Sequence, residues 1–204
     1  MYVLASWKKL IDNGKGIFIK YNLNSFSYDI PITIIGVGNV GISAMKLAIS
    51  KGYTNINLID NNYEKISMIK GDYDNIVDIS IYNMNNDNLQ FLMRKSIITI
   101  GSIYNTGKEA ERLLSNSILD SMSDGAIIMD VAIDQGGITE QSKPTTKDNP
   151  IIKYKNINIY CVPNIPSSAP RKASILLSNS IVNYVKAIAT SKQDRYPELL
   201  SEIL

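Results

Sequence analysis

Short runs of β-branched and other apolar residues recur along the chain from Pro31 onward, separated by more polar stretches. Runs that are apolar at nearly every position are typical of parallel strands buried on both faces. Strands are therefore expected at Ile32–Ile35, Ile56–Ile59, Val77–Ile81, Ile97–Ile100, Ala126–Met129 and Ile157–Tyr160.

The stretches between these runs place their apolar residues at helical spacing. Helices are expected over Ile42–Ser50, Tyr63–Lys70, Leu89–Lys95, Ser115–Met122 and a long final segment that starts near Ser168, with Pro170 in its first turn. Residues 135–150 are expected to form a polar loop. Strands that alternate with helices predict an α/β fold, a doubly wound parallel sheet of about six strands with right-handed crossovers.

The two ends of the chain depart from this alternation. Within residues 1–30, Trp7 and its apolar neighbours lie at helical spacing, and Asn13-Gly14 provides a helix stop before a polar linker. We expect residues 31–190 to form one domain and residues 191–204 to form a C-terminal tail.

Composition narrows the classes of function. Apolar residues make up 45% of the 204 positions and charged residues 20%, as in ordinary globular proteins, and the net charge is +2. The charges are interspersed, so neither a nucleic acid nor a membrane is an expected partner. No apolar run reaches the ~18 residues that cross a bilayer and no signal peptide opens the chain, so a cytoplasmic location is expected.

Some residue types limit the available chemistry. The chain has no histidine, so any proton transfer that needs an imidazole must be supplied from elsewhere. The single cysteine, Cys161, lies in a buried-looking run and is expected to be a structural thiol. Asp72, Asp74 and Asp78 lack the spacing of a cation-binding loop, so no metal site is expected.

The first expected strand leads directly into Gly36-Val37-Gly38-Asn39-Val40-Gly41, which opens the first expected helix. In this context the G-x-G-x-x-G pattern indicates a dinucleotide site of the Rossmann type. Gly36 would make the tight turn, Gly38 would let the pyrophosphate approach the backbone, and Gly41 would allow close helix packing. The free N–H groups at the start of the helix would bind the phosphates.

Asp60 ends the second expected strand. A carboxylate at this position accepts hydrogen bonds from the adenosine ribose hydroxyls and repels a 2′-phosphate. The sequence therefore predicts NAD as the cofactor in preference to NADP.

The string Asp130-Val131-Ala132-Ile133-Asp134-Gln135-Gly136-Gly137 resembles that of the alanine dehydrogenases, in the wider group that includes the pyridine nucleotide transhydrogenases. Further segments that resemble theirs are Ile100–Lys108, Ser142–Thr146, Tyr160–Pro166 and Leu177–Asn179. The resemblance runs from about Lys15 to Ala189, and transhydrogenase subunits carry a different acidic-amide pattern at Asp134–Gly137.

The resemblance implies a set of cofactor contacts at matched positions. The adenosine side would be bound by Asn39, Val40, Asp60 and Lys65. Ile103 and Tyr104 would also contact the cofactor, from a loop after the fourth strand that resembles the one bordering the nicotinamide side. The nicotinamide end would be lined by Val131, Ala132, Ile133, Asp134, Lys143, Val162, Asn164 and Ile165. Lys143 stands where the family usually has arginine, so the charge is kept and the fork geometry is lost. Pro163, Ser167 and Ser168 also depart from the common pattern, which leaves the amino-acid substrate open.

The resemblance also implies a reaction, in which hydride passes between the nicotinamide and an L-amino acid, converting L-alanine to pyruvate and ammonia. Asp134 is the implied catalytic residue and would orient or deprotonate the water that hydrolyses the imino acid. In the family an N-terminal domain holds the substrate, and residues 1–30 resemble the remnant of the interdomain helix and linker. On this interpretation the isolated chain binds NAD(H) without oxidising alanine, and the parent enzyme is a homo-oligomer.

Other interpretations remain open. An opine-forming reductase resembling carboxyethylornithine synthase shares much of the loop pattern, although Gln135-Gly136-Gly137 favours alanine dehydrogenase. A non-catalytic NAD-sensing or assembly module would also fit a chain without a substrate domain. Asp130, which lies shortly before Asp134, is expected to cap a helix or form a salt bridge near the sheet edge.

Overall fold

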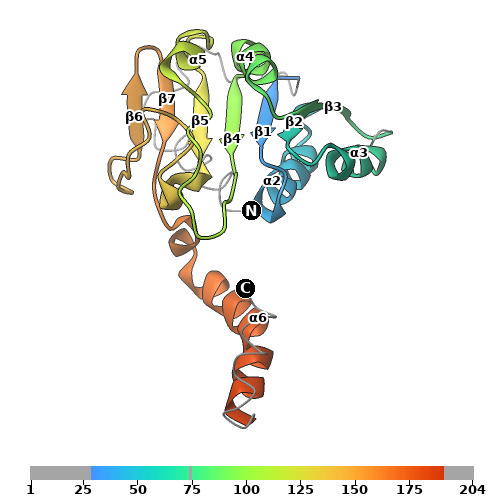
Figure 1. Cartoon of the computed structure of the whole chain (residues 1–204), viewed down its shortest axis with the longest axis vertical. Coiled ribbons are helices and arrows are strands. Elements are labelled where there is room, and N and C mark those ends of the chain that lie inside the picture. The colour runs from blue at the N-terminus through green and yellow to red at the C-terminus, as the bar shows by residue number, and fades with distance from the viewer. Residues whose placement is uncertain (1–28, 74, 191–204) are drawn as a thin grey trace. The chain divides into compact units, whose positions relative to one another are not determined.

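The computed structural model describes residues 29–73 and 75–190, and these fall into two compact units that divide between Ile165 and Pro166. The first unit holds a seven-stranded sheet and its helices, and the second holds one long helix (Figure 1). The strands are β1 (Ile32–Ile35), β2 (Asn55–Asp60), β3 (Asp78–Asn83), β4 (Ile98–Gly101), β5 (Ile127–Asp130), β6 (Ile151–Tyr154) and β7 (Ile157–Tyr160). The α-helices are α2 (Asn39–Ser50), α3 (Tyr63–Gly71), α4 (Asn86–Lys95), α5 (Asn116–Asp120) and α6 (Pro170–Thr190), and 3-10 turns lie at η2 (Val131–Gln135) and η3 (Ile165–Ser168).

The strands lie in the order β3-β2-β1-β4-β5-β7-β6 (Figure 1). All neighbours from β3 to β7 are parallel, and only β6 runs antiparallel to its neighbour β7. The chain moves outward in one direction from β1 to β3 and then returns to β4 on the other side of β1. This is a doubly wound Rossmann sheet, as predicted, and it places the point of reversal between β1 and β4.

Side chains along each strand alternate between two hydrophobic clusters on opposite faces of the sheet. Ile34 and Leu58 join the cluster that includes residues of α2 and α3. Ile35 and Ile128 join the cluster that includes residues of α4 and α5. Because both faces are covered, strand positions on either side must be apolar, which explains the nearly continuous apolar runs.

The expectation of about six strands omitted β6, which lies just beyond the expected loop at 135–150. This edge strand is half-buried, with Lys153 exposed, so it lacks the continuous apolar run that marks the inner strands. Its hairpin to β7 turns at Lys155, whose φ is 50°, without the glycine that usually signals such a turn.

Several helix bounds also differ from expectation. Helices α2 and α4 begin three residues earlier than expected, at Asn39 and Asn86. The first turn of α4 is polar and carries no apolar periodicity, and that of α2 lies within the glycine fingerprint. Helix α5 is shorter than expected and is capped by Ser115, whose hydroxyl accepts the Ile118 N–H at 3.4 Å. In the second unit α6 begins with Pro170, as predicted. None of the helices within residues 29–73 and 75–190 is long and apolar enough to cross a membrane.

Candidate functional site

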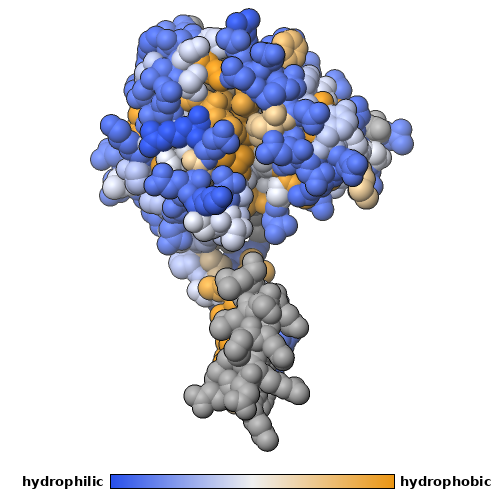
Figure 2. Space-filling view, in the orientation of Figure 1, coloured by the Kyte–Doolittle hydropathy of each residue, from blue (hydrophilic) through white to orange (hydrophobic). Residues whose placement is uncertain are grey.

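A cavity of about 990 Å³ opens where the chain leaves the carboxyl ends of β1, β2, β3 and β4. This is the edge at which open α/β sheets bind ligands, beside the reversal of strand order. Its lining includes Gly36, Gly38, Asn39, Val40, Asp60, Lys65, Ile103 and Tyr104, all expected from the sequence or the resemblance. On the face shown in Figure 2, hydrophobic side chains are visible in a hollow between two mostly polar parts of the sheet unit.

The three glycines of the fingerprint are each needed for a different reason. Gly36 has a φ of 84°, and a Cβ there would lie 2.8 Å from the backbone nitrogen of Ile103. A Cβ on Gly41 would overlap the carbonyl oxygen of Gly36, so a side chain would push α2 away from the turn. Nothing lies within 4 Å of a Cβ built on Gly38, which faces the open cavity. A side chain at Gly38 would therefore occupy ligand space and leave the packing of the protein unchanged.

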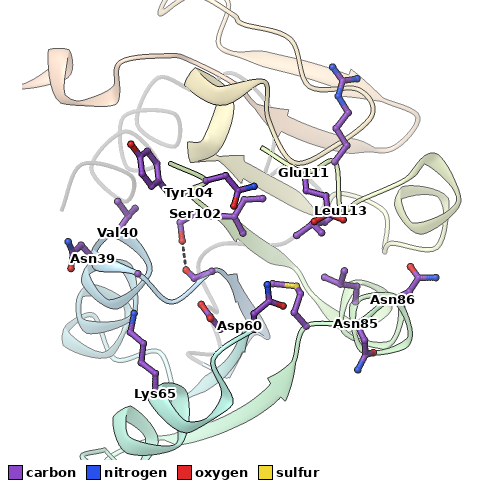
Figure 3. Close-up of a pocket in the computed structure, with 18 of the residues that line it drawn as sticks. Asn39, Val40, Asp60, Lys65, Asn85, Asn86, Ser102, Tyr104, Glu111 and Leu113 are labelled. Carbon is purple, nitrogen blue, oxygen red and sulfur yellow. Dashed lines mark hydrogen bonds between the residues drawn. The ribbon is translucent and has the colours of Figure 1, made fainter. Parts of the chain in front are cut away.

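Asp60 is held in place by two backbone N–H groups. Its Oδ2 accepts the N–H of Val37 at 2.6 Å, and its Oδ1 accepts the N–H of Asn62 at 2.9 Å. Because a carboxylate can accept about four hydrogen bonds, each oxygen can still accept one from a ligand. Figure 3 shows Asp60 beside the glycine turn, with Lys65 of α3 nearby and Asn39 and Val40 at the start of α2.

The N-terminus of α2 faces the same space. No side chain caps it, and its first turn holds no acidic residue. The first N–H groups of a helix have no partner within the helix and carry a partial positive charge, so they favour an anionic ligand. The glycine turn therefore has, on one side, a helix end of the kind that suits a phosphate and, on the other, a carboxylate that can accept hydrogen bonds from hydroxyl groups.

Sequence reasoning missed several residues of this cavity. Ser102 is nearly buried and its hydroxyl donates to the carbonyl oxygen of Gly36 at 2.6 Å, bracing the turn from β4 (Figure 3, dashed line). The other lining residues not foreseen are Asn61, Met84, Asn85, Asn86, Leu89, Asn105, Glu111, Arg112, Leu113 and Ser115. Met84 and Asn85 directly follow β3, so the rule that parallel strands end at one edge could have found them.

The residues assigned to the nicotinamide end lie in η2, in the loop between η2 and β6, and after β7, and they do not line this cavity. Asp134 is exposed, and its two carboxylate oxygens accept the N–H of Asn164 at 3.1 and 3.2 Å. Asn164 has a φ of 50°, a left-handed conformation that asparagine tolerates better than most residues. The structure thus brings Asp134 and Asn164 together, and contact of either with the cofactor stays a prediction.

The remaining members of the nicotinamide set differ in exposure. The side chains of Ala132 and Ile133 are buried in a core cluster, so only their backbone could meet a ligand. Val162 and Ile165 are also buried, whereas Lys143 is exposed. Val131 is partly buried against the other cluster.

Asp130 does not form the expected cap or salt bridge. It ends β5, an inner strand of the sheet, and is fully buried. Its Oδ2 accepts the N–H of Ile138 at 2.9 Å and the hydroxyl of Ser142, while Oδ1 is buried with no hydrogen-bond partner among the described residues. Burial raises the pKa of this carboxyl, and the bonds from Ser142 and Ile138 offset only part of that effect.

Cys161 is buried directly after β7. Burial raises the pKa of its thiol to about 11, and the nearby Asp130 adds to the shift. The thiol is therefore neutral at physiological pH, which agrees with the predicted structural role.

The fold and the cavity define a dinucleotide-binding domain of the Rossmann class. The chain belongs to the family described as alanine dehydrogenase/PNT, C-terminal domain, which it matches over residues 28–202. It is 32% identical over 158 residues to the alanine dehydrogenase of Mycolicibacterium smegmatis and 33% identical over 159 residues to that of Staphylococcus epidermidis. Each match covers 78% of this chain and 42% of the relative, so the chain spans about two fifths of the curated relatives.

Solved structures agree with this assignment. An L-alanine dehydrogenase superposes with a TM-score of 0.77 at 26% identity, over 98% of this chain and 54% of that one. A transhydrogenase from Sinorhizobium meliloti has a TM-score of 0.67 at 19% identity, over 92% of this chain and 54% of that one, and shows the shared fold.

Proposed function

We propose that this chain is the NAD(H)-binding domain of an amino-acid dehydrogenase, with L-alanine as the amino acid. The observation that carries the proposal is the placement of Asp60, which two backbone N–H groups fix beside the uncapped start of α2. On one side of the open Gly38, the Asp60 carboxylate suits the ribose of a dinucleotide. On the other side, the N–H groups at the start of α2 suit its pyrophosphate. The residues present fit NAD(H), the cofactor that the family implies.

The chain's own residues would bind and orient the cofactor. The first N–H groups of α2 would bind the pyrophosphate, and Asp60 would accept hydrogen bonds from the adenosine ribose. Apolar residues such as Met84 and Leu113 would contact the adenine, because they line the same cavity as Asp60. The bound nicotinamide supplies the hydride chemistry, which the protein cannot supply itself.

Asp134 would act at the other end of the site. Its exposed carboxylate is held by the backbone N–H of Asn164 and keeps acceptor sites for a water molecule. In the proposed reaction Asp134 orients or deprotonates the water that attacks the imino acid. The groups that hold the amino acid would come from the part of the relatives that this chain does not match.

The proposal also includes a cytoplasmic location and self-association into a homo-oligomer, as expected from the sequence and the family. Light scattering of the purified chain measures its oligomeric state directly.

A matched pair of glycine substitutions tests the site. Gly38→Val should reduce NADH affinity by at least about a hundredfold, because the side chain fills the space that the pyrophosphate must enter. Gly71→Val is the control, since a Cβ on Gly71 also meets open space but lies outside the cavity. NADH fluorescence titration should show that Gly38→Val has lost binding and that Gly71→Val has kept it. A thermal melt should show that both variants remain folded. Normal binding by Gly38→Val would mean that the fingerprint is only a turn.

A further inference from the structure

The side chain of Gln135 makes contacts that the proposed function does not use. Gln135 ends η2, directly after Asp134, and its carboxamide faces the loop that follows β4. Its Oε1 accepts the backbone N–H of Asn105 at 3.2 Å, and its Nε2 donates to the backbone carbonyl of Asn105 at 2.9 Å. One side chain thus satisfies both backbone groups of one residue, as a neighbouring strand would.

A third bond fixes the far end of the same loop. The backbone carbonyl of Gln135 accepts the N–H of Ala110 at 2.7 Å, and Ala110 is buried. Residues 104–109 between these points are exposed, with Tyr104 74% accessible, so the loop has little packing of its own. Bonds to Gln135 therefore hold this loop at both of its ends.

The loop after β4 and the 3-10 turn η2 lie differently with respect to the cavity. Ile103, Tyr104 and Asn105 line the cavity directly, next to the glycine turn. The turn that Gln135 ends carries Asp134, which is bound to Asn164 and lies outside the lining. Gln135 joins the cavity wall to the segment that is assigned to the nicotinamide.

Only an amide side chain of this length can both accept the N–H of Asn105 and donate to its carbonyl oxygen. A carboxamide offers a donor and an acceptor together, whereas a carboxylate offers acceptors alone. In Gln135→Glu the second oxygen would face the carbonyl oxygen of Asn105, so attraction would become repulsion. Gln135→Met would keep the length without charge and would lose both bonds.

We propose that Gln135 is a positioning residue that locks the loop after β4 to the turn carrying Asp134 and so forms the nicotinamide end of the cofactor site. This inference rests on the proposed function. The adenosine half of the cofactor is assigned to residues that Gln135 does not contact. Replacing Gln135 should therefore weaken binding of the nicotinamide half and leave binding of the adenosine half unchanged.

The test compares NADH with ADP-ribose, which lacks the nicotinamide, by calorimetric titration of the full chain. In Gln135→Glu and Gln135→Met, NADH affinity should fall about tenfold, the order expected when the two hydrogen bonds that position the loop are lost, while ADP-ribose affinity changes less than about twofold. Gln141→Glu is the control, because it makes the same replacement and removes the bond from Nε2 of Gln141 to Oδ1 of Asn116 at the start of α5. It should leave the affinity for both ligands unchanged.

Equal losses for NADH and ADP-ribose in the Gln135 variants, or no loss for either, would overturn the positioning role. A charge effect on the phosphates would appear in Gln135→Glu and be absent from Gln135→Met, and that result also overturns it. If the unaltered chain binds neither ligand, the proposed function itself is wrong and this inference is lost with it. Binding of both ligands with equal affinity by the unaltered chain would leave the proposed function standing and overturn the inference alone.

Discussion

Asp60 and Asp130 end two strands of the same sheet, yet their carboxyl groups meet opposite conditions. Asp60 is partly exposed and receives one N–H group on each oxygen, so its charge is supported and it can still receive a ligand. Asp130 is fully buried and has one oxygen with no partner among the described residues. The first environment suits ligand binding, and the second favours a neutral carboxyl that holds the segment before Ser142 in place.

The raised pKa of Asp130 predicts a pH-dependent stability. Its folded-state pKa lies above the unfolded value of about 3.9, so its stabilising contribution is complete below about pH 3.9 and is lost as the pH rises through the folded-state value. Asp130→Asn cannot ionise, so its free energy of unfolding relative to the unaltered protein should rise with pH across that window. Denaturant unfolding between about pH 4 and pH 8 measures the difference.

Asp120 provides a control of opposite sign. The hydrogen bond from Lys155 lowers the pKa of the Asp120 carboxyl, so its contribution is lost as the pH falls through the folded-state value. The relative stability of Asp120→Asn should therefore fall as the pH rises from about pH 1 to about pH 5, where the same unfolding measurement is made for this pair, by a small amount because the pair is exposed. A difference for Asp130→Asn that does not change with pH would contradict the buried, neutral carboxyl.

At the scale of elements, the packing of α2 against the first turn is set by Gly41. A Cβ there would overlap the backbone carbonyl of Gly36, which cannot move without disturbing β1. Gly41→Ala should lower the free energy of unfolding by about 1–3 kcal/mol, as overpacking usually does, and should weaken dinucleotide binding as well. Ser43→Ala, at an exposed position of the same helix, should change neither by a comparable amount. Urea unfolding together with NADH titration measures both effects, and an unchanged Gly41→Ala would contradict this packing.

The inner elements could be predicted from sequence because burial on both faces leaves a local signature. Runs such as Ile32–Ile35 and Ala126–Met129 are apolar at nearly every position, and each marks a strand that the structure contains. Edge elements lack this signature, so β6, with its exposed Lys153, was missed. Helix starts were misplaced where polar residues such as Asn86 form the first turn.

The residues of the candidate site also divide into those that the sequence could identify and those that it could not. The glycine turn and Asp60 are contiguous with strands and were identified from spacing alone. Residues that meet only in three dimensions gave no such signal, which is why Ser102, bonded to Gly36, and the burial of Asp130 were not foreseen. The contact of Asp134 with Asn164 depends on the left-handed backbone of Asn164, which the sequence does not specify.

At the scale of the whole molecule, binding and turnover should be separable. Hydride transfer requires the donor and acceptor carbons to be held about 3–3.5 Å apart, and such positioning accounts for about 7–11 kcal/mol of catalysis. Proton transfer near neutral pH usually employs histidine, and this chain has none. The chain alone should therefore bind NADH and show no measurable oxidation of L-alanine.

An assay of NADH formation from L-alanine at alkaline pH tests this division. Turnover should appear when the chain is fused to the unmatched part of an alanine dehydrogenase relative. It should disappear in the fused Asp134→Ala variant, with NADH binding retained. Appreciable turnover by the chain alone would contradict the division of labour.

The central claim, that Asp60 and the start of α2 form an NAD(H) site, is tested most directly by calorimetric titration of the full chain with NADH and with NADPH. NADH should bind at least about tenfold more tightly, because the 2′-phosphate of NADPH would face the fixed carboxylate. Asp60→Ala should weaken NADH binding by about 1–3 kcal/mol and remove the preference, whereas Asp148→Ala, at an exposed position outside the cavity, should do neither. Equal affinity of the unaltered chain for the two dinucleotides would contradict the role of Asp60.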